Sequence, residues 1–422
     1  MPSTIAYLAN LFPAQTERYV VDEIGELRKR GVTVIPCSAR RVLSGSHSDP
    51  DSWVRQTLYL QPLRLKTILR SLRFALCNLT VIQVFLRRIL FQGRESLAKR
   101  ICALAHTFLG IYYAVALEHR HVQHIHVHHG YFGSWVAMVA ARLLGIPFSM
   151  TLHGSDILLD PAYLDLKLEF CEVCITISEF NRQYLLTHYS KVNPAKIITH
   201  RLGVDCAENR PSTFRTRTDT SSFIILAAGR LHPVKDHAFL LRACRELKAR
   251  GLQFTCLIAG EGNERRHLER VIDEFDLARD VRLLGQVSHD EMHDYYEMAD
   301  LVVLTSRSEG LPLVLMEAMA HEKIVLAPEI TAIPELVSHG ETGFLYRSGS
   351  LEGFVAQLEM IHDNRVALGP LGRAARVYVQ HHFDQQKNLT SFCDRMFATL
   401  GAASATDNSA PQETVYEDPV LQ

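Results

Sequence analysis

The stretch SRSEGLPLVLMEAMA, residues 306–320, follows the aliphatic run Leu301–Leu304, and the two together indicate a strand, a tight polar loop and a helix. An uninterrupted aliphatic run is typical of a buried strand in a parallel sheet. Pro312 suits the first turn of the helix, where its missing N–H costs nothing, and Leu313 and Met316 give the helix an apolar stripe. In open α/β sheets, ligands bind at the carboxyl end of such a strand.

Two carboxylates eight positions apart stand in this stretch: Glu309 in the loop and Glu317 one turn into the helix. Both can face one crevice. A carboxylate accepts hydrogen bonds from hydroxyls, in which sugars and riboses are rich. The alternative is that Glu309 is a turn residue and Glu317 a solvated helix residue.

The spacing resembles the Glu-x7-Glu signature of the family-4 retaining glycosyltransferases, which have the two-domain GT-B fold. This resemblance implies that Glu309 contacts the donor sugar and Glu317 the ribose of the nucleotide, with Gly310 and Leu311 beside them in the donor site. The resemblance extends from about residue 5 to residue 390 and is densest over residues 223–346.

The strand Phe223–Ala228 runs into a turn that suits phosphate. Gly229 is followed by Arg230 and Lys235, and Asp236 is a good N-cap for the next helix. A helix start offers free N–H groups and a positive dipole end. The turn resembles the family pattern Gly-Arg-Leu-x-x-x-Lys-Gly, with Asp236 in place of the last Gly; the resemblance implies that Arg230 and Lys235 hold the donor diphosphate.

Cleavage of a nucleotide sugar develops charge on the departing diphosphate, and two cations can stabilise that charge in place of a metal. The one Asp-x-Asp triplet, Asp49-Pro50-Asp51, has no strand before it and is interpreted as a loop. We therefore expect a metal-independent enzyme without a cofactor.

Two further strand ends complete the expected donor site. Gly260 and Gly262 resemble the family's Gly-x-Gly turn near the nucleotide, and Val287 follows a strand whose counterpart in relatives borders the base. Ser288 is explained structurally, as the N-cap of a helix with Glu291 at the capping-box position.

The first half opens with a β-α-β pattern: Ile5–Leu8, a helical stripe, and Val32–Pro36. The segment FPAQTERYV between the first strand and the helix, with Thr16, Glu17 and Arg18, resembles a variant found in transferases of exopolysaccharide and lipopolysaccharide synthesis. These three residues are expected on the acceptor side.

His153 stands at the end of the strand Ser149–Leu152, beside Gly154, where a side chain reaches the interdomain crevice. The resemblance implies contact with the donor sugar near its reacting carbon; the alternative is a core histidine.

The run HVQHIHVHHG, residues 121–130, places His124, His126 and His128 on one strand face, which permits a metal, but relatives carry a similar strand without one.

Composition bounds the remaining possibilities. Net charge is −1, with 47% hydrophobic and 22% charged residues, so we expect a globular protein that does not bind nucleic acid. Nine scattered cysteines make a disulfide framework improbable, and the Cys171/Cys174 pair is interpreted as core. We expect no signal peptide, and no apolar run near the roughly 20 residues of a membrane span.

Residues 62–100 hold nine Lys or Arg against one acid, Glu95, interleaved with leucines and other apolar residues. A basic amphipathic helix is typical of membrane-surface binding. The alternative is a helical pair with a core side and solvated charges. The segment suggests an anionic membrane partner, a lipid-linked acceptor, and a cytoplasmic protein peripheral on the inner face of the cell membrane.

The predicted fold is therefore α/β of the GT-B type, with two Rossmann-like domains. The predicted parts are an acceptor domain (1–205), a linker (206–222), a nucleotide-sugar domain (223–382), a helix crossing back (383–400) and a disordered tail (401–422). The predicted function is retaining transfer of a sugar to a glycan acceptor in envelope or exopolysaccharide synthesis. Two alternatives stay open: a nucleotide-sugar epimerase of the same fold and a non-catalytic sugar-binding subunit.

Overall fold

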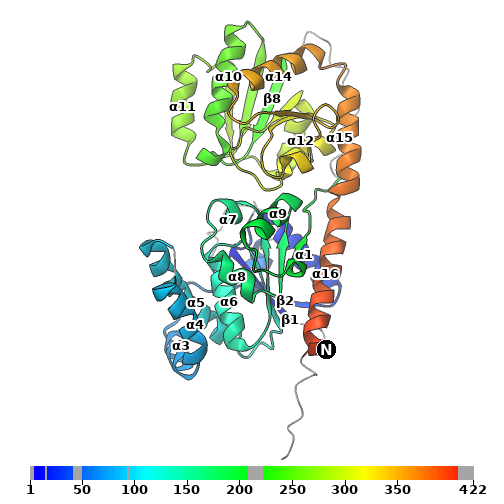
Figure 1. Ribbon diagram of the computed structural model, residues 1–422. Helices are drawn as coiled ribbons and strands as arrows, with labels where there is room; N and C mark the ends of the chain where they lie inside the picture. Colours follow the sequence, from blue (N-terminus) through cyan, green and yellow to red (C-terminus); the bar gives the residue numbers. More distant parts are fainter. Residues whose placement is uncertain (1–3, 15–16, 41–49, 93–94, 208–221, 407–422) are drawn as a thin grey trace, which may run out of the picture.

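The computed structural model describes residues 4–14, 17–40, 50–92, 95–207 and 222–406. These residues form two α/β lobes, one above the other, with a long helical segment along one side of both (Figure 1). Thr16, Asp49 and most of the predicted linker lie outside the described residues. Pro50 and Asp51 of the Asp-x-Asp triplet were interpreted as part of a loop, but they are the first residues of helix α2 (Pro50–Gln56).

The first lobe is built on a sheet of seven parallel strands in the order β3-β2-β1-β4-β5-β6-β7. Strand β1 pairs with β2 and β4, since Ile5 lies opposite Val34 on one side and His124 on the other. The strands are β1 Thr4–Leu11, β2 Thr33–Arg40, β3 Leu58–Tyr59, β4 His124–His128, β5 Phe148–Leu152, β6 Val173–Thr176 and β7 Ile197–Thr199.

Helices cover both faces of this sheet. Helix α6 packs against the sheet and α5 packs against α6, while α3 and α4 extend outward at the left of Figure 1. The helices are α1 Arg18–Lys29, α2 Pro50–Gln56, α3 Leu65–Cys77, α4 Leu79–Phe91, α5 Leu97–Leu117, α6 Phe132–Leu144, α7 Ser155–Leu158, α8 Leu164–Phe170 and α9 Glu179–His188.

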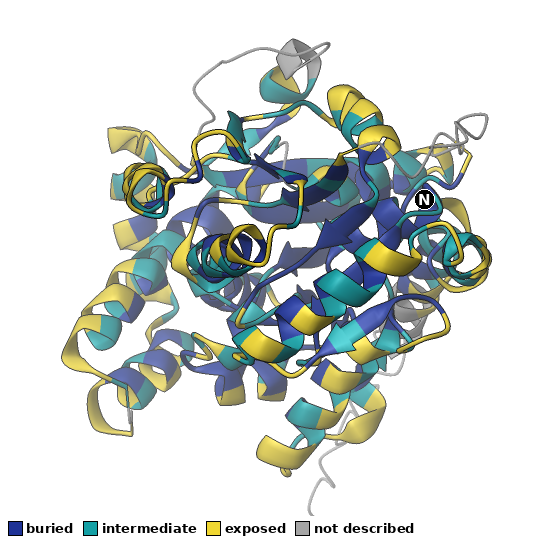
Figure 2. Ribbon diagram, turned by 90° about the horizontal axis from the view of Figure 1, so that it is seen from above, coloured by how far each residue is buried: buried dark blue, intermediate teal, exposed yellow. Residues whose placement is uncertain are grey.

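The second lobe has six parallel strands in the order β10-β9-β8-β11-β12-β13. Seen from above, its strands are buried and the helices around them turn exposed faces to solvent (Figure 2). The strands are β8 Phe223–Ala228, β9 Phe254–Ala259, β10 Val281–Gly285, β11 Leu301–Val303, β12 Ile324–Pro328 and β13 Phe344–Tyr346. The helices are α10 His237–Ala249, α11 Arg265–Glu274, α12 His289–Met298, α13 Leu313–Ala320, α14 Leu351–Asn364 and α15 Gly369–His382.

The chain passes between the lobes twice, and the two passages are tied together. Val204 N donates to Phe383 O at 2.9 Å, and Gln385 N donates to Val204 O at 3.1 Å. The final helix, α16 (Gln385–Thr406), then packs against α1 of the first lobe. The predicted return helix is confirmed, but it continues to Thr406, so the expectation of disorder from residue 401 is wrong for residues 401–406.

Helix α5 corrects another expectation. Its 21 residues are long and apolar enough to cross a membrane, although the sequence was expected to hold no such run. Half of its apolar window is buried in the first lobe, where Tyr113 and Ala114 are fully buried. A buried core helix of a large α/β lobe can be as long and as apolar as a helix that spans a membrane.

The cysteines follow expectation: all nine are described, all are free thiols, and Cys171 and Cys174 are buried.

Candidate functional site

The loops that follow β8 and β11 lie side by side at the carboxyl edge of the second sheet. Thr305 Oγ1 donates to Lys235 O at 2.9 Å, and Arg307 N donates to Val234 O at 2.8 Å. Adjacent parallel strands place these loop ends together. The predicted phosphate turn and the predicted sugar loop are therefore neighbours.

Within this pair of loops, Lys235 and Glu309 form an ion pair. Lys235 Nζ lies 2.5 Å from Glu309 Oε1, and both side chains are largely buried. The stem of Lys235 passes over Gly229, where an added Cβ would lie 3.5 Å from Lys235 Cε. Two of the predicted site residues thus meet directly, and the sequence did not show this pairing.

Asp236, the residue that stands where relatives have Gly, adopts a left-handed backbone with φ of 47°. Asp tolerates this conformation better than most residues. Its side chain accepts from Phe239 N, which confirms the predicted N-cap, and its other oxygen lies 2.7 Å from Arg307 Nε. Because Arg307 pairs with this carboxylate, its negative charge is balanced beside the phosphate turn.

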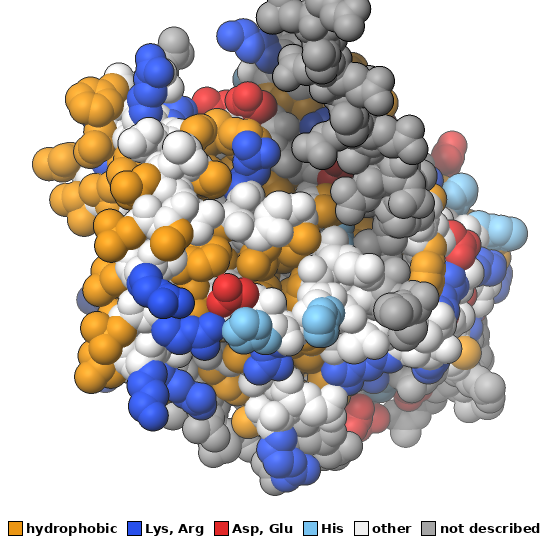
Figure 3. Space-filling view, turned by 90° about the horizontal axis from the view of Figure 1, so that it is seen from below, with side chains coloured by type: hydrophobic (Ala, Val, Ile, Leu, Met, Phe, Trp, Pro, Cys, Tyr) orange, Lys and Arg blue, Asp and Glu red, His pale blue; other side chains and the backbone are white. Residues whose placement is uncertain are grey.

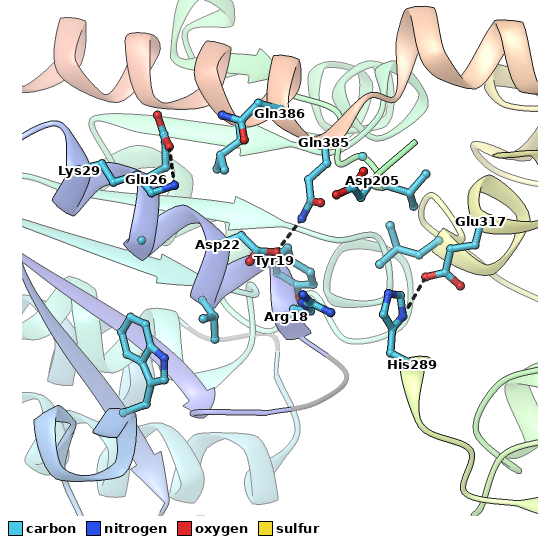
Figure 4. Close-up of a pocket in the computed structure, with 17 residues that line it drawn as sticks. Arg18, Tyr19, Asp22, Glu26, Lys29, Asp205, His289, Glu317, Gln385 and Gln386 are labelled. Atoms are coloured by element: carbon cyan, nitrogen blue, oxygen red, sulfur yellow. Dashed lines mark hydrogen bonds and ion pairs between the residues drawn. The ribbon is translucent and has the colours of Figure 1, made fainter. Parts of the chain in front are cut away.

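Glu317 lines a cavity of about 480 Å³ between the lobes, with Arg18 facing it from α1 (Figure 4). Its Oε2 accepts from the Tyr296 hydroxyl at 2.6 Å, and its Oε1 lies 4.0 Å from His289 Nδ1. Burial raises the pKa of Glu317, and the hydrogen bond from Tyr296 opposes that rise. The carboxylate is held on the crevice side of α13 by a fixed donor.

The predicted glycines have mainly backbone roles. A Cβ on Gly260 would lie 2.0 Å from Gly229 O, and one on Gly262 would lie 2.2 Å from Leu231 O, so the turn after β9 packs tightly on the phosphate turn. Gly310 is where the lobes meet, since its Cβ would lie 2.2 Å from His153 O. Leu311 is 5% exposed, which leaves backbone groups for a ligand. Val287 is half-buried, two residues after β10.

Across the crevice, Asp156 shapes the turn that carries His153. Its fully buried carboxylate accepts from the backbone N–H groups of His153, Gly154 and Gly130 at 2.8–3.1 Å. Lys167 completes this arrangement from α8, because its Nζ reaches three backbone carbonyls, and burial lowers its pKa to about 7.

Glu17 and His129 form an ion pair on the same side, with Glu17 Oε1 3.2 Å from His129 Nε2. Burial opposes both charges. The hydrogen bond between them nevertheless holds the pKa of Glu17 below its ordinary value, and together with Asp156 it holds the pKa of His129 above its own. The charge of Arg230, which comes from the second lobe, also lowers the pKa of Glu17 and of His129.

Two residues that contact the predicted site were not predicted as part of it: Glu23 was not considered, and His128 was considered only as a metal ligand. His128 Nε2 lies 3.0 Å from Glu23 Oε2, and His128 Nδ1 lies 3.0 Å from His153 Nε2. The signal for Glu23 was present, because it shares the buried face of α1 with Val20 and Ile24, where a carboxylate needs a partner.

Two family models match the chain in succession. The model "Glycosyltransferase Family 4" matches residues 16–208, and "Glycosyl transferases group 1" matches residues 209–377. Among curated proteins, the amylovoran biosynthesis glycosyltransferase of Erwinia amylovora is 34% identical over 167 residues, 38% of this chain and 41% of that protein. The lipopolysaccharide 1,2-N-acetylglucosaminetransferase of Salmonella typhimurium is 30% identical over 176 residues, 38% of this chain and 46% of that protein. The chain thus spans less than half the length of these curated relatives.

Among solved structures, the Anabaena protein HepE in complex with UDP superposes with a TM-score of 0.67 at 17% identity, covering 94% of this chain and 100% of that one. Other structures of HepE hold UDP and glucose, or UDP-glucose. The likeness confirms the predicted fold, two Rossmann-like domains facing across a crevice.

Proposed function

Because this chain belongs to family 4 of the glycosyltransferases, we propose that it moves a sugar from a nucleotide-sugar donor to a glycan acceptor in envelope or exopolysaccharide synthesis. The observation that carries the proposal is the Lys235–Glu309 pair at the carboxyl edge of the second sheet, with Glu317 on the helix that follows. A cation that can bind phosphate and two carboxylates that can bind hydroxyls then come from adjacent loops and the following helix at one edge of the sheet.

In the proposed donor complex, the diphosphate lies against Lys235 and Arg230, Glu309 accepts from sugar hydroxyls, and Glu317 accepts from the ribose. The ion pair of the free protein is then replaced, because the phosphate takes Lys235 and releases Glu309. Two relatives, one named for amylovoran biosynthesis and one a lipopolysaccharide N-acetylglucosaminetransferase, support this assignment, as do UDP and UDP-glucose in the HepE structures.

We propose a retaining transfer. The bond between the sugar C1 and the β-phosphate oxygen breaks while the acceptor oxygen bonds to C1 on the same face. The departing phosphate oxygen takes the acceptor proton, so no protein base is needed. Arg230 and Lys235 stabilise the charge that develops on the diphosphate, and loss of one such donor typically costs roughly 10²–10³ in rate. The product should carry the same anomeric configuration as the donor, which NMR of the product measures.

The same two cations lead us to propose that transfer needs no metal or other cofactor. Activity measured in EDTA should equal activity measured with added Mg²⁺ or Mn²⁺. A complete loss in EDTA that is restored by metal would contradict this.

The acceptor side is proposed to sit at an anionic membrane surface. Eleven of the seventeen large apolar side chains exposed in the described residues lie between Leu63 and Ile101. Four of them form one stripe along α3, namely Leu65, Leu69, Leu72 and Leu76. Viewed from below, hydrophobic side chains gather along the left edge of the molecule, the side of α3 and α4 in Figure 1, with Lys and Arg beside them (Figure 3).

Lys66 and Arg73 flank this stripe, and neither has an ion-pair partner among the described residues. A lone apolar stripe would fit a protein partner, but apolar residues with unpaired cations beside them fit an anionic bilayer, where each cation contributes about 1 kcal/mol. A lipid-linked acceptor and a position on the cytoplasmic face of the membrane follow from this proposal.

Sedimentation with vesicles tests the membrane proposal. The wild type should bind vesicles containing phosphatidylglycerol at low salt, and Lys66→Glu/Arg73→Glu should release it. The matched control, Arg266→Glu/Arg270→Glu on α11, changes the same number of charges on the other lobe and should bind like wild type. If both variants were released equally, net charge alone would explain the binding to vesicles, and the proposed membrane surface at α3 would be wrong.

Calorimetric titration with UDP, GDP and ADP in EDTA tests the donor site. One nucleotide should bind selectively, and Glu317→Ala should weaken it, because the ribose loses its acceptor. Glu352→Ala, an exposed carboxylate on α14, is the control and should change nothing. If none of the three nucleotides binds to the wild type, the donor assignment is wrong.

A further inference from the structure

A chain of three side chains runs from the core of the first lobe to the crevice. Glu23 is on α1, His128 ends β4, and His153 follows β5. Glu23 Oε2 lies 3.0 Å from His128 Nε2, and His128 Nδ1 lies 3.0 Å from His153 Nε2. His128 has no exposed side-chain surface, and that of Glu23 is 5% exposed. A carboxylate this deep needs a partner, and this one has specific ones.

The donors and acceptors determine where the protons lie. The Tyr7 hydroxyl donates to Glu23 Oε2, so its own oxygen and the carboxylate are both left as acceptors, 2.9 and 3.0 Å from His128 Nε2. We therefore assign the proton of His128 to Nε2. His128 Nδ1 is then a lone pair. It accepts from His153 Nε2, which must be protonated. His153 is left with a bare Nδ1.

The surroundings of His153 keep its ring neutral. Burial lowers the pKa of His153 well below its ordinary value, and the neighbouring His129 and His128 add to the shift. The ring lies 4.3 Å from the His129 ring and 5.0 Å from the Tyr19 ring, centroid to centroid, so its orientation is also held by packing. A neutral histidine with a fixed tautomer is a directed hydrogen-bond acceptor.

A buried metal offers another explanation of this cluster, since Glu23, His126 and His128 offer atoms within 4.8 Å of one another. The hydrogen bonds of His126 speak against it. Its Nδ1 lies 2.7 Å from Ser149 Oγ, and its Nε2 lies 3.2 Å from Thr151 Oγ1, so both ring nitrogens already have hydroxyl partners.

We propose that Glu23 and His128 are positioning residues that hold His153 in the tautomer with its proton on Nε2, so that Nδ1 accepts a hydrogen bond from a hydroxyl of the donor sugar. This inference rests on the proposed function for the identity of the ligand. The inference implies that the donor sugar presents a free hydroxyl to His153, and not a group that can only accept a hydrogen bond. The carboxylate orients His128, and His128 orients the residue that touches substrate.

The tautomer can be measured without substrate. Long-range ¹H–¹⁵N spectra of the full chain, with the His153 signals identified by their loss in His153→Gln, should show a protonated Nε2 and a bare Nδ1. In His128→Gln, the His153 signals should change to a mixture of tautomers. The control His124→Asn changes a buried histidine on the same strand that bonds only Ser149, and should leave the His153 signals unchanged. A wild-type His153 protonated on Nδ1 overturns the proposal.

A double-mutant cycle tests the consequence for turnover. Wild type is first offered UDP-glucose, UDP-galactose and GDP-mannose, and the nucleotide sugar that it consumes is then used as the substrate for all variants. His128→Gln and His153→Gln should each lower kcat/KM by roughly 10- to 100-fold, the cost of one misdirected buried hydrogen bond. The double variant should lose no more than the worse single one, because His128 acts through His153. Losses that multiply overturn the proposal. If wild type consumes no sugar, the proposed function fails, while the tautomer measurement still decides this inference.

Discussion

At the scale of single residues, the Glu17–His129 pair makes stability depend on pH. The pKa of His129 is raised above 6.5, so the pair contributes fully below that value and is lost as the pH rises through the folded pKa. The pKa of Glu17 is lowered below 4.5, so the pair is also present above that value and is lost as the pH falls further. The contribution is therefore largest between these two ordinary values.

Glu17→Gln should lower the melting temperature most at pH 5.5, and the gap to wild type should narrow at pH 8.5. Differential scanning calorimetry at the two pH values measures this. Asp156 stays near His129 in the variant and retains part of its charge stabilisation. A gap that stays constant or widens at pH 8.5 would show that His129 is not the titrating partner.

Asp236 offers a second test at this scale, because its left-handed backbone favours glycine whereas its N-cap role favours a polar side chain. Asp236→Gly keeps the backbone conformation, and glycine at an N-cap costs only a few tenths of a kcal/mol. Asp236→Ala loses the cap and keeps a Cβ in the left-handed region without the polar side chain that lets Asp tolerate it, for about 1–2 kcal/mol in all. Urea denaturation should rank the alanine variant clearly below the glycine variant. The reverse order would refute this account.

At the scale of elements, the strands were predictable because their aliphatic runs are short, continuous and bounded by polar loops. β8 begins and ends at the predicted residues. The capping box of α12 is present as its Ser288 and Glu291 indicate. Pro312 stands one position before the helix, at the N-cap. Local chemistry decides these features, so the sequence is sufficient for them.

What the sequence could not show are contacts between distant elements. The Glu23–His128–His153 chain joins three elements, and residue spacing carries no sign of it. The same holds for Gly310 against His153, where the contact depends on how the lobes meet. The length of α5 was missed for another reason: Lys99 and Arg100 in its first turn interrupt the apolar count that the sequence reasoning used.

Lys167 gives the element-scale prediction. Its Nζ ties α8 to the loop before α6 through the carbonyls of Gly130 and Tyr131, and also bonds Ala162 O. Lys167→Met keeps the length of the side chain but leaves buried acceptors without that donor, and should cost about 2–4 kcal/mol of unfolding free energy. The matched control Lys191→Met removes an exposed lysine and should cost less than about 0.5 kcal/mol. Equal stability of the two variants would contradict the role of Lys167.

At the scale of the whole molecule, Glu335 joins the lobes. Its carboxylate accepts from Glu179 N at 3.1 Å and Phe180 N at 2.7 Å, at the start of α9 in the other lobe, and lies 3.1 Å from Arg201 Nη2. A carboxylate at a helix N-terminus is stabilised by the free N–H groups and the helix dipole. Glu335 therefore links the second lobe to α9 and Arg201 of the first lobe.

Glu335→Ala should weaken this contact between the lobes by about 1–3 kcal/mol, the cost of removing a charged acceptor from two donors. Small-angle X-ray scattering should then report a larger radius of gyration, and the amides of Glu179 and Phe180 should exchange with solvent faster. Glu352→Ala serves again as the surface control. Unchanged hydrogen exchange at those two amides would show that Glu335 does not hold the two lobes together.

The return of α16 to the first lobe has a consequence for how the chain is made. Phe392, Cys393 and Met396 of this helix belong to the same buried cluster as Tyr7 and Ile24, at the other end of the sequence. The ribosome synthesises the first sheet before the second lobe, yet the helix that covers this face is synthesised only after the second lobe. The nascent chain therefore carries an uncovered apolar face while the second lobe is being translated, which makes it a natural client for ribosome-bound chaperones. A stop codon between the two lobes would yield a first lobe that never acquires its cover.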